Sequence, residues 1–155
     1  MDAFPEHKVT QHGLFVCPDL PILATSTNGL ITAPDCLGQG VLEIKCPVSD
    51  HGVDELCALK SFCLQQNSDG LLKLKKQHQY YTQLQWEMGV TRCKWADFVV
   101  YTQTCSGYSM HVERVMFSQD FWATAVKKAC KFYKDFIALE ILTRRVCQNV
   151  KLVAV

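Results

Sequence analysis

The residues with the clearest chemical potential are Glu43 and Lys45, which lie two positions apart in a β-branched and apolar stretch. Because successive strand residues point to opposite faces, the carboxylate and the ammonium share one face, and Leu42 and Ile44 pack behind them on the other. A carboxylate can hold a divalent cation, and a nearby ammonium can stabilise charge that develops on a phosphate. The pattern therefore predicts a strand over residues 40–46 of the kind that metal-dependent nucleases use. The alternative is an ion pair on an exposed strand.

Two amides could complete such a site. Asn28 stands in an Asn28-Gly29 hairpin turn, at the position where an acidic residue normally supplies the second metal ligand. Gln83 falls on a different helix face from the apolar stripe of Tyr80, Leu84 and Met88. An uncharged amide can hold a water or a phosphate oxygen without competing for the cation. A plain exposed polar face is the alternative for Gln83.

The elements that must position these residues follow from periodicity and from turn residues. Ser118 is a good N-cap for a final helix, and Gly89 is a candidate cap for the end of the helix that carries Gln83. The expected strands are 14–16, 22–25, 30–32, 40–46, 94–102 and 110–117, and the expected helices are 53–66 and 71–88, with another after Ser118. This order predicts an α/β fold, a mixed sheet flanked by helices, in one domain over residues 1–155.

Composition and charge limit the classes of protein. The chain has 155 residues, 48% hydrophobic and 20% charged, which is typical of a globular protein, and its formal net charge is only +1. The charge is unevenly distributed, because basic residues gather between residues 71 and 95. Such a cluster predicts nucleic-acid contact or a solvated face. The candidate DNA-binding residues are Lys73, Lys75, Lys76, Arg92 and Lys94.

The cysteines and the N-terminal sequence indicate the compartment. Nine cysteines are an odd number, no Cys-x-x-Cys pair occurs, and several fall inside expected strands or helices, where a reduced thiol acts as a small hydrophobe. No secretory signal and no apolar run long enough for a membrane span are visible. We therefore expect an intracellular, reducing compartment, nucleus or cytoplasm, and no membrane partner.

Three stretches in combination carry a resemblance to a known family. They are Leu-Ala-Thr-Ser-Thr-Asn-Gly-Leu at 23–30, Leu-Glu-Ile-Lys-Cys-Pro at 42–47, and Tyr-Tyr-Thr-Gln-Leu-Gln at 80–85. With them the chain resembles the YqaJ-type viral recombinase domain, the lambda-exonuclease-like branch of the restriction-endonuclease-like (PD-(D/E)xK) nucleases. The resemblance runs from about residue 10 to about residue 140 and implies a restriction-endonuclease-like core.

The resemblance implies an exonuclease that needs Mg²⁺ (or Mn²⁺) and resects linear double-stranded DNA from 5′ to 3′. By position, Glu43 is a metal ligand, the carbonyl of Ile44 completes the metal shell, and Asn28 stands where the family has its first metal carboxylate. Lys45 positions the attacking water or stabilises phosphate charge, and Gln83 matches a glutamine beside the site. The implied partners are double-stranded DNA ends, further copies of the chain in a trimeric ring, and a single-strand annealing protein.

Two departures from the family pattern bear on activity. The family has Ser-Pro-Asp-Gly where this chain has Ser26-Thr27-Asn28-Gly29, and an amide brings no charge to a magnesium site. Family members also carry a helical region before the first strand, which this chain is expected to lack, either as a fragment or through loss of the catalytic half. We therefore expect weakened cleavage. The alternatives are a DNA-binding module of the same fold that does not cut and an interaction remnant.

Overall fold

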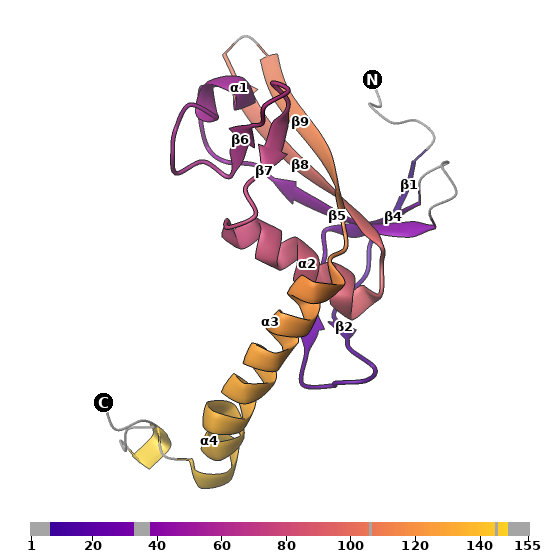
Figure 1. Ribbon diagram of the computed structural model, residues 1–155, viewed down its shortest axis with the longest axis vertical. Coiled ribbons are helices and arrows are strands. Elements are labelled where there is room, and N and C mark those ends of the chain that lie inside the picture. The colour runs from indigo at the N-terminus through magenta and orange to yellow at the C-terminus, as the bar shows by residue number, and fades with distance from the viewer. Residues whose placement is uncertain (1–6, 33–37, 106, 145, 149–155) are drawn as a thin grey trace. The chain divides into compact units, whose positions relative to one another are not determined.

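The computed structural model describes residues 7–32, 38–105, 107–144 and 146–148 (Figure 1). The chain divides into two compact units, Met1–Phe117 and Ser118–Val155. The first unit holds every candidate site residue, and the described part of the second is helical. Within the described residues, no helix has the length and apolar character that crossing a bilayer requires. A single domain over residues 1–155 stays a prediction.

A five-stranded sheet is the centre of the first unit, with strand order β1-β4-β5-β8-β9. Only β5 and β8 run parallel, and the other neighbours are antiparallel, so the predicted mixed sheet is confirmed. Glu43 stands opposite Phe98 and Lys45 opposite Val100 in the register of β5 and β8. The five strands are β1 (Lys8–Thr10), β4 (Gly29–Thr32), β5 (Gln39–Lys45), β8 (Trp95–Thr104) and β9 (Gly107–Met116).

The predicted hairpin turn at Asn28-Gly29 is wrong. Gly29 is the first residue of β4 and pairs with Leu42 of β5. A side chain on Gly29 would meet the Cγ1 atom of Val9 at 2.9 Å, so close packing of β1 explains the glycine better than a turn does. A separate two-stranded sheet, β2 (Phe15–Val16) and β3 (Ala24–Thr25), lies where the first two strands were expected.

The predicted helix over residues 71–88 is wrong in its first third. Leu72 and Leu74 lie in strand β7 (Leu72–Leu74), which pairs with β6 (Leu64–Gln66) across the turn at Asn67. The helix α2 (Gln79–Thr91) begins only after His78, whose ring nitrogen accepts a hydrogen bond from the backbone N–H of Tyr80. Strand alternation and the polar turn outweigh helix propensity here.

The other end of α2 and the preceding helix also differ from the prediction. The helix continues through Gly89 and stops at Arg92, which takes a left-handed conformation with φ 62°. The helix expected over residues 53–66 is reduced to the four residues of α1 (Val53–Leu56), because Leu64 is buried in β6. Hydrophobic residues at these spacings suit a buried strand as well as a helix.

The hydrophobic core forms where α2 contacts β5 and β8. Leu84 and Met88 of α2 are fully buried, as their spacing predicts, whereas Tyr80 at the start of the helix is half-buried. The small β6–β7 sheet adds Leu64 and Leu74 to the same cluster. The remaining buried members of the cluster are Leu30, Val41, Val53, Cys63, Cys93, Ala96, Phe98, Val100 and Val115. The core therefore fixes α2 against the strand that carries Glu43 and Lys45.

The second unit begins as predicted at Ser118, whose hydroxyl accepts a hydrogen bond from the N–H of Phe121. Its elements are α3 (Gln119–Phe132), a π-helical turn over Tyr133–Ile137, α4 (Ala138–Thr143) and a 3₁₀ turn over Val146–Gln148. Among the residues that the structure describes, these cysteines are free thiols: Cys17, Cys46, Cys57, Cys63, Cys93, Cys105 and Cys130. Burial raises the pKa of the Cys63 thiol to about 11, so this thiol is a core residue rather than a nucleophile.

Candidate active site

The sheet presents Glu43 and Lys45 on one face of β5, as strand alternation predicts. Glu43 is buried and retains 4% of its exposure, whereas 20% of the Lys45 side chain is exposed. The Nζ atom of Lys45 lies 2.7 Å from Oε1 of Glu43, so the two form an ion pair at the border of the core. On the opposite face, Leu42 packs beside Ile31 and Trp95, but Ile44 is exposed, contrary to the expectation that both pack there.

Helix α2 brings Gln83 into contact with both members of this pair. The Nζ of Lys45 donates to Oε1 of Gln83 at 2.9 Å, and Nε2 of Gln83 donates to Oε1 of Glu43 at 2.7 Å. The three side chains thus form a closed triangle of polar contacts. Lys45 also lies over the ring of Tyr80, with Nζ 4.4 Å from the ring centroid. The ammonium therefore has two polar partners and lies over one aromatic ring.

A fourth polar group, the carboxyl of Glu87, adjoins the triangle and was not among the sequence-predicted residues. Its Oε1 accepts a second hydrogen bond from Nε2 of Gln83, at 2.8 Å. Glu87 has no exposed surface, and within the described residues its Oε2 has no hydrogen-bond partner. A signal was present, because Glu87 is one helical turn after Gln83 and is the acidic residue of that helix.

Burial of the Glu87 carboxyl raises its pKa to about 8, and the nearby charge of Glu43 adds to the rise. The Gln83 hydrogen bond and the ammonium of Lys45 act in the opposite direction. At neutral pH Glu87 therefore carries a proton. The site combines one carboxylate paired with a cation and one carboxylic acid, and both contact the same amide nitrogen.

Asn28 approaches the site from the residue before β4. Its Oδ1 accepts a hydrogen bond from the backbone N–H of Ile44, at 2.8 Å. This bond ties the residue directly before β4 to the backbone between Glu43 and Lys45. The amide thus has a structural role, in addition to the weak metal-ligand role that its position predicts.

Comparison with known proteins places the chain in a family. The model of the YqaJ-like viral recombinase domain matches residues 4–94, more than half of the chain, and this range contains Asn28, Glu43, Lys45 and Gln83. The chain belongs to the YqaJ-like viral recombinase domain family. No curated protein matches the sequence.

Solved structures share the fold of this YqaJ-like domain. It is similar to an alkaline exonuclease, LHK-Exo, from Laribacter hongkongensis, with a TM-score of 0.64 and 23% sequence identity over 94% of this chain and 66% of that chain. The structure of the same exonuclease in complex with dAMP gives a TM-score of 0.62 and 22% identity over the same shares of the two chains. The YqaJ-like chain thus spans about two thirds of the length of LHK-Exo.

The oxygen donors near Glu43 suit a hard divalent cation. They are the Glu43 carboxylate, the carbonyl of Ile44 and Oδ1 of Asn28, which keeps a second lone pair beside its bond to the Ile44 N–H. Among the described residues, no group of three or more His, Cys, Asp or Glu side chains is arranged to hold a metal ion. Magnesium is commonly held by one or two carboxylates together with waters and substrate phosphates. The residues present fit such a cation with Glu43 as the single charged ligand.

The predicted DNA-binding residues of the YqaJ-like domain lie on several different elements. Lys73 is in β7, 3.5 Å from the Glu113 carboxylate, and Lys75 follows this strand. The Nζ of Lys75 donates to the backbone carbonyls of Lys60 and Phe62, each at 2.7 Å, so its charge is used to fasten a loop.

The remaining three basic residues lie at different places. Lys76 is exposed and borders a hollow that Lys73, Tyr81 and Arg114 also line. Arg92 ends α2 and forms an exposed ion pair with Asp19 at 2.8 Å, while Lys94 is exposed just before β8. The basic cluster between residues 71 and 95 is therefore divided between the two ends of α2.

Proposed function

We propose that this YqaJ-like domain acts on the ends of linear double-stranded DNA, as a metal-dependent exonuclease whose cleavage is weakened by Asn28. The observation that carries the proposal is the triangle of Lys45, Gln83 and Glu43. In it, the buried Glu43 carboxylate and the Lys45 ammonium contact each other and are both hydrogen-bonded to the Gln83 side-chain amide. Membership in the YqaJ-like family and the fold shared with an alkaline exonuclease support this choice of substrate and reaction.

The side chains of the triangle have distinct roles in phosphodiester hydrolysis. An ammonium has three N–H donors, and Lys45 uses two on Glu43 and Gln83, which leaves one for a phosphoryl oxygen or for the attacking water. The Gln83 amide fixes this orientation because it contacts both partners. A bound Mg²⁺ or Mn²⁺ supplies Lewis acidity at the phosphate, and Glu43, the Ile44 carbonyl and Asn28 would hold it.

A second candidate function is supported by the count of charged ligands. With Asn28 in place of a carboxylate and Glu87 protonated, Glu43 is the one carboxylate of the candidate site, among the described residues, that can attract a cation. A site with so little negative charge favours a module that binds DNA ends and cuts them slowly or not at all. Metal-dependent cleavage separates the two functions, since salt-sensitive DNA binding is expected for both.

The test is digestion of 5′-phosphorylated linear duplex DNA in Mg²⁺ and in Mn²⁺, comparing the wild type with Lys45→Ala and Asn28→Asp. We expect slow cleavage by the wild type, none by Lys45→Ala, and faster cleavage by Asn28→Asp, whose carboxylate can still accept the Ile44 N–H. Cleavage that survives Lys45→Ala would contradict the proposed chemistry. If neither the wild type nor Asn28→Asp cleaves the duplex, the result would favour the DNA-binding module.

Three finer features belong to the same proposal. Resection runs from 5′ to 3′, which duplexes labelled at one end or the other distinguish. The chain assembles with itself into a trimer, and a monomeric mass in light scattering would contradict this. The single strand that resection leaves is the natural substrate of an annealing protein, so such a protein is the expected partner.

A further inference from the structure

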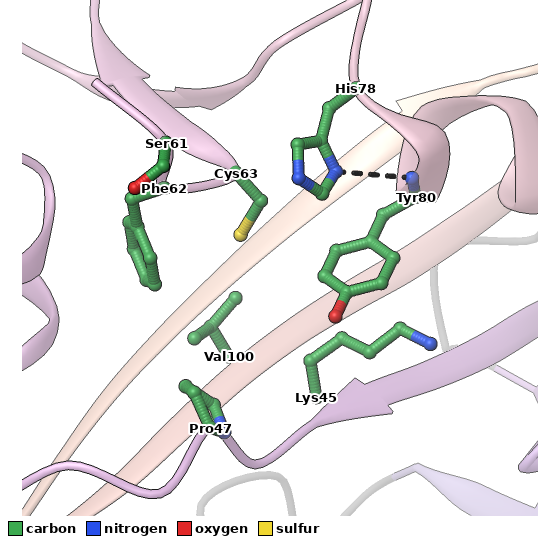
Figure 2. A pocket seen from close by; sticks show the side chains of 8 residues that line it. All are labelled: Lys45, Pro47, Ser61, Phe62, Cys63, His78, Tyr80 and Val100. Atoms are coloured by element: carbon green, nitrogen blue, oxygen red, sulfur yellow. Dashed lines mark hydrogen bonds between the residues drawn. The ribbon is translucent and has the colours of Figure 1, made fainter. Parts of the chain in front are cut away.

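A small cavity adjoins Lys45 (Figure 2). Its volume is about 130 Å³, which is below the range of about 300–1,000 Å³ usual for sites that take a whole small ligand. Eight residues line it: Lys45, Pro47, Ser61, Phe62, Cys63, His78, Tyr80 and Val100. The cavity thus has room for one flat ring system rather than for a base pair.

The walls of the cavity are aromatic on two sides. Figure 2 shows Phe62 on one side and His78 with Tyr80 on the other, with Val100 between them. His78 and Tyr80 meet edge to face, with ring centroids 4.6 Å apart. Phe62 is in turn held through its backbone, because its carbonyl accepts a hydrogen bond from Lys75. Rings on opposite walls form a slot suited to a planar group.

The cavity also offers a directed polar group. The Nδ1 atom of His78 accepts the Tyr80 N–H at 3.2 Å, so a neutral His78 ring carries its proton on Nε2. Burial and the charge of Lys75 lower the pKa of His78, which favours this neutral form. A ring N–H donor at an aromatic slot matches the acceptor atoms on the edges of nucleobases.

Lys45 joins the cavity to the candidate active site. Its side chain lines the cavity, while its Nζ contacts Glu43 and Gln83. A phosphate at this ammonium therefore has an aromatic slot directly beside it. A nucleotide is a chemical class that carries a phosphate and a planar ring on the same sugar.

We propose that the cavity binds one unpaired nucleobase, from the nucleotide next to the phosphodiester at Lys45, by stacking against Phe62. This inference rests on the proposed function and names the part of the substrate that the site recognises. Stacking on an aromatic ring imposes little base preference, so the slot should accept purine and pyrimidine bases alike.

The test compares binding of deoxyadenosine 5′-monophosphate and of 2-deoxyribose 5-phosphate, which lacks the base, by calorimetry in EDTA. Base stacking on an aromatic side chain predicts roughly 5- to 100-fold tighter binding of the complete nucleotide. Thymidine 5′-monophosphate should show a similar gain. Equal affinity of the base-free sugar phosphate, or no binding of either compound, would overturn the proposal.

Two substitutions at Phe62 separate stacking from loss of fold. Phe62→Leu keeps an apolar group and should abolish the preference for the complete nucleotide, whereas Phe62→Trp keeps an aromatic face and should retain it. Leu59→Ala, at an exposed position of the same loop and outside the cavity, is the control and should change neither affinity nor thermal stability. A preference that survives in a folded Phe62→Leu variant would contradict stacking on this ring.

The binding test is independent of catalysis. A protein that prefers the complete nucleotide but cuts no duplex would retain the base site and refute the exonuclease. A protein that cuts duplex DNA without this preference would retain the exonuclease and refute the base site. The two proposals can therefore fail separately.

Discussion

Two buried carboxyl groups lie on either side of the Gln83 amide and differ in what else they contact. Glu43, on β5, has the ammonium of Lys45 at 2.7 Å, whereas Glu87, on α2, leaves one oxygen without a partner among the described residues. Both accept a hydrogen bond from the same Nε2 atom. The difference shows that two buried carboxyl groups on one amide can have unlike surroundings, because only Glu43 has a cation at contact distance.

This comparison predicts unequal effects of the same chemical change on cleavage. Glu43→Gln removes the charge of the one proposed metal-binding carboxylate among the described residues, and we expect a loss of about 1,000-fold in the rate of duplex cleavage, equivalent to about 4 kcal/mol. Glu87→Gln replaces a protonated carboxyl by an amide of the same shape, and we expect less than about a threefold change. The measurement is single-turnover cleavage of end-labelled duplex DNA.

Thermal unfolding of both variants is the control, since either change could disturb the core. Equal losses of cleavage in two well-folded variants would show that Glu43 and Glu87 act alike. The proposed difference between Glu43 as a charged metal ligand and Glu87 as a protonated carboxyl would then be wrong.

The raised pKa of Glu87 predicts a pH dependence of stability. The folded protein binds the Glu87 proton with a pKa of about 8, against 4.5 for an unperturbed carboxyl, so the stability that this group contributes is greatest below pH 4.5 and falls as pH rises toward 8. Between these values the slope is about 1.4 kcal/mol per pH unit, which gives about 3 kcal/mol over two units. Glu87→Gln should lack this loss.

The measurement is urea unfolding of wild type and Glu87→Gln at pH 5.5 and 7.5 in EDTA. The difference between the two proteins cancels titration of other groups, provided that Glu43 and Lys45 keep their contacts. Parallel loss of stability in both proteins would mean that Glu87 is already ionised in the folded state.

A smaller contrast concerns neighbouring lysines of the divided basic cluster. Lys75→Ala removes two hydrogen bonds to loop carbonyls and should lower the free energy of unfolding by roughly 1–3 kcal/mol. Lys76→Ala changes an exposed side chain and should leave stability within about 0.5 kcal/mol while it weakens DNA binding a few-fold and lowers its salt dependence. Urea unfolding and binding titrations at several salt concentrations measure both. A loss of stability in Lys76→Ala but not in Lys75→Ala would contradict the structural role assigned to Lys75.

Much of the fold follows from local patterns in the sequence. The alternation around Glu43, the alternation of β8 and the cap at Ser118 depend on residues close together in the chain, and all three agree with the structure. The region from 53 to 78 was predicted wrongly because Leu64, Leu72 and Leu74 fit helical and strand spacing alike. Pairing of β6 with β7 and burial in the shared core select the strands.

The sequence by itself determined that Glu43 and Lys45 share a face, because the alternation of a strand is a property of adjacent residues. Only the tertiary structure decided which groups meet them. Gln83 lies 38 residues after Lys45 and 40 residues after Glu43 in the sequence. Glu87 adjoins the site because it shares the Gln83 amide. Burial and long-range contacts decide three further features. They are the protonation of Glu87, the hydrogen bonds from Lys75 to loop carbonyls, and the aromatic slot beside Lys45. Those features exist only once α2 and the β6–β7 sheet have packed against β5.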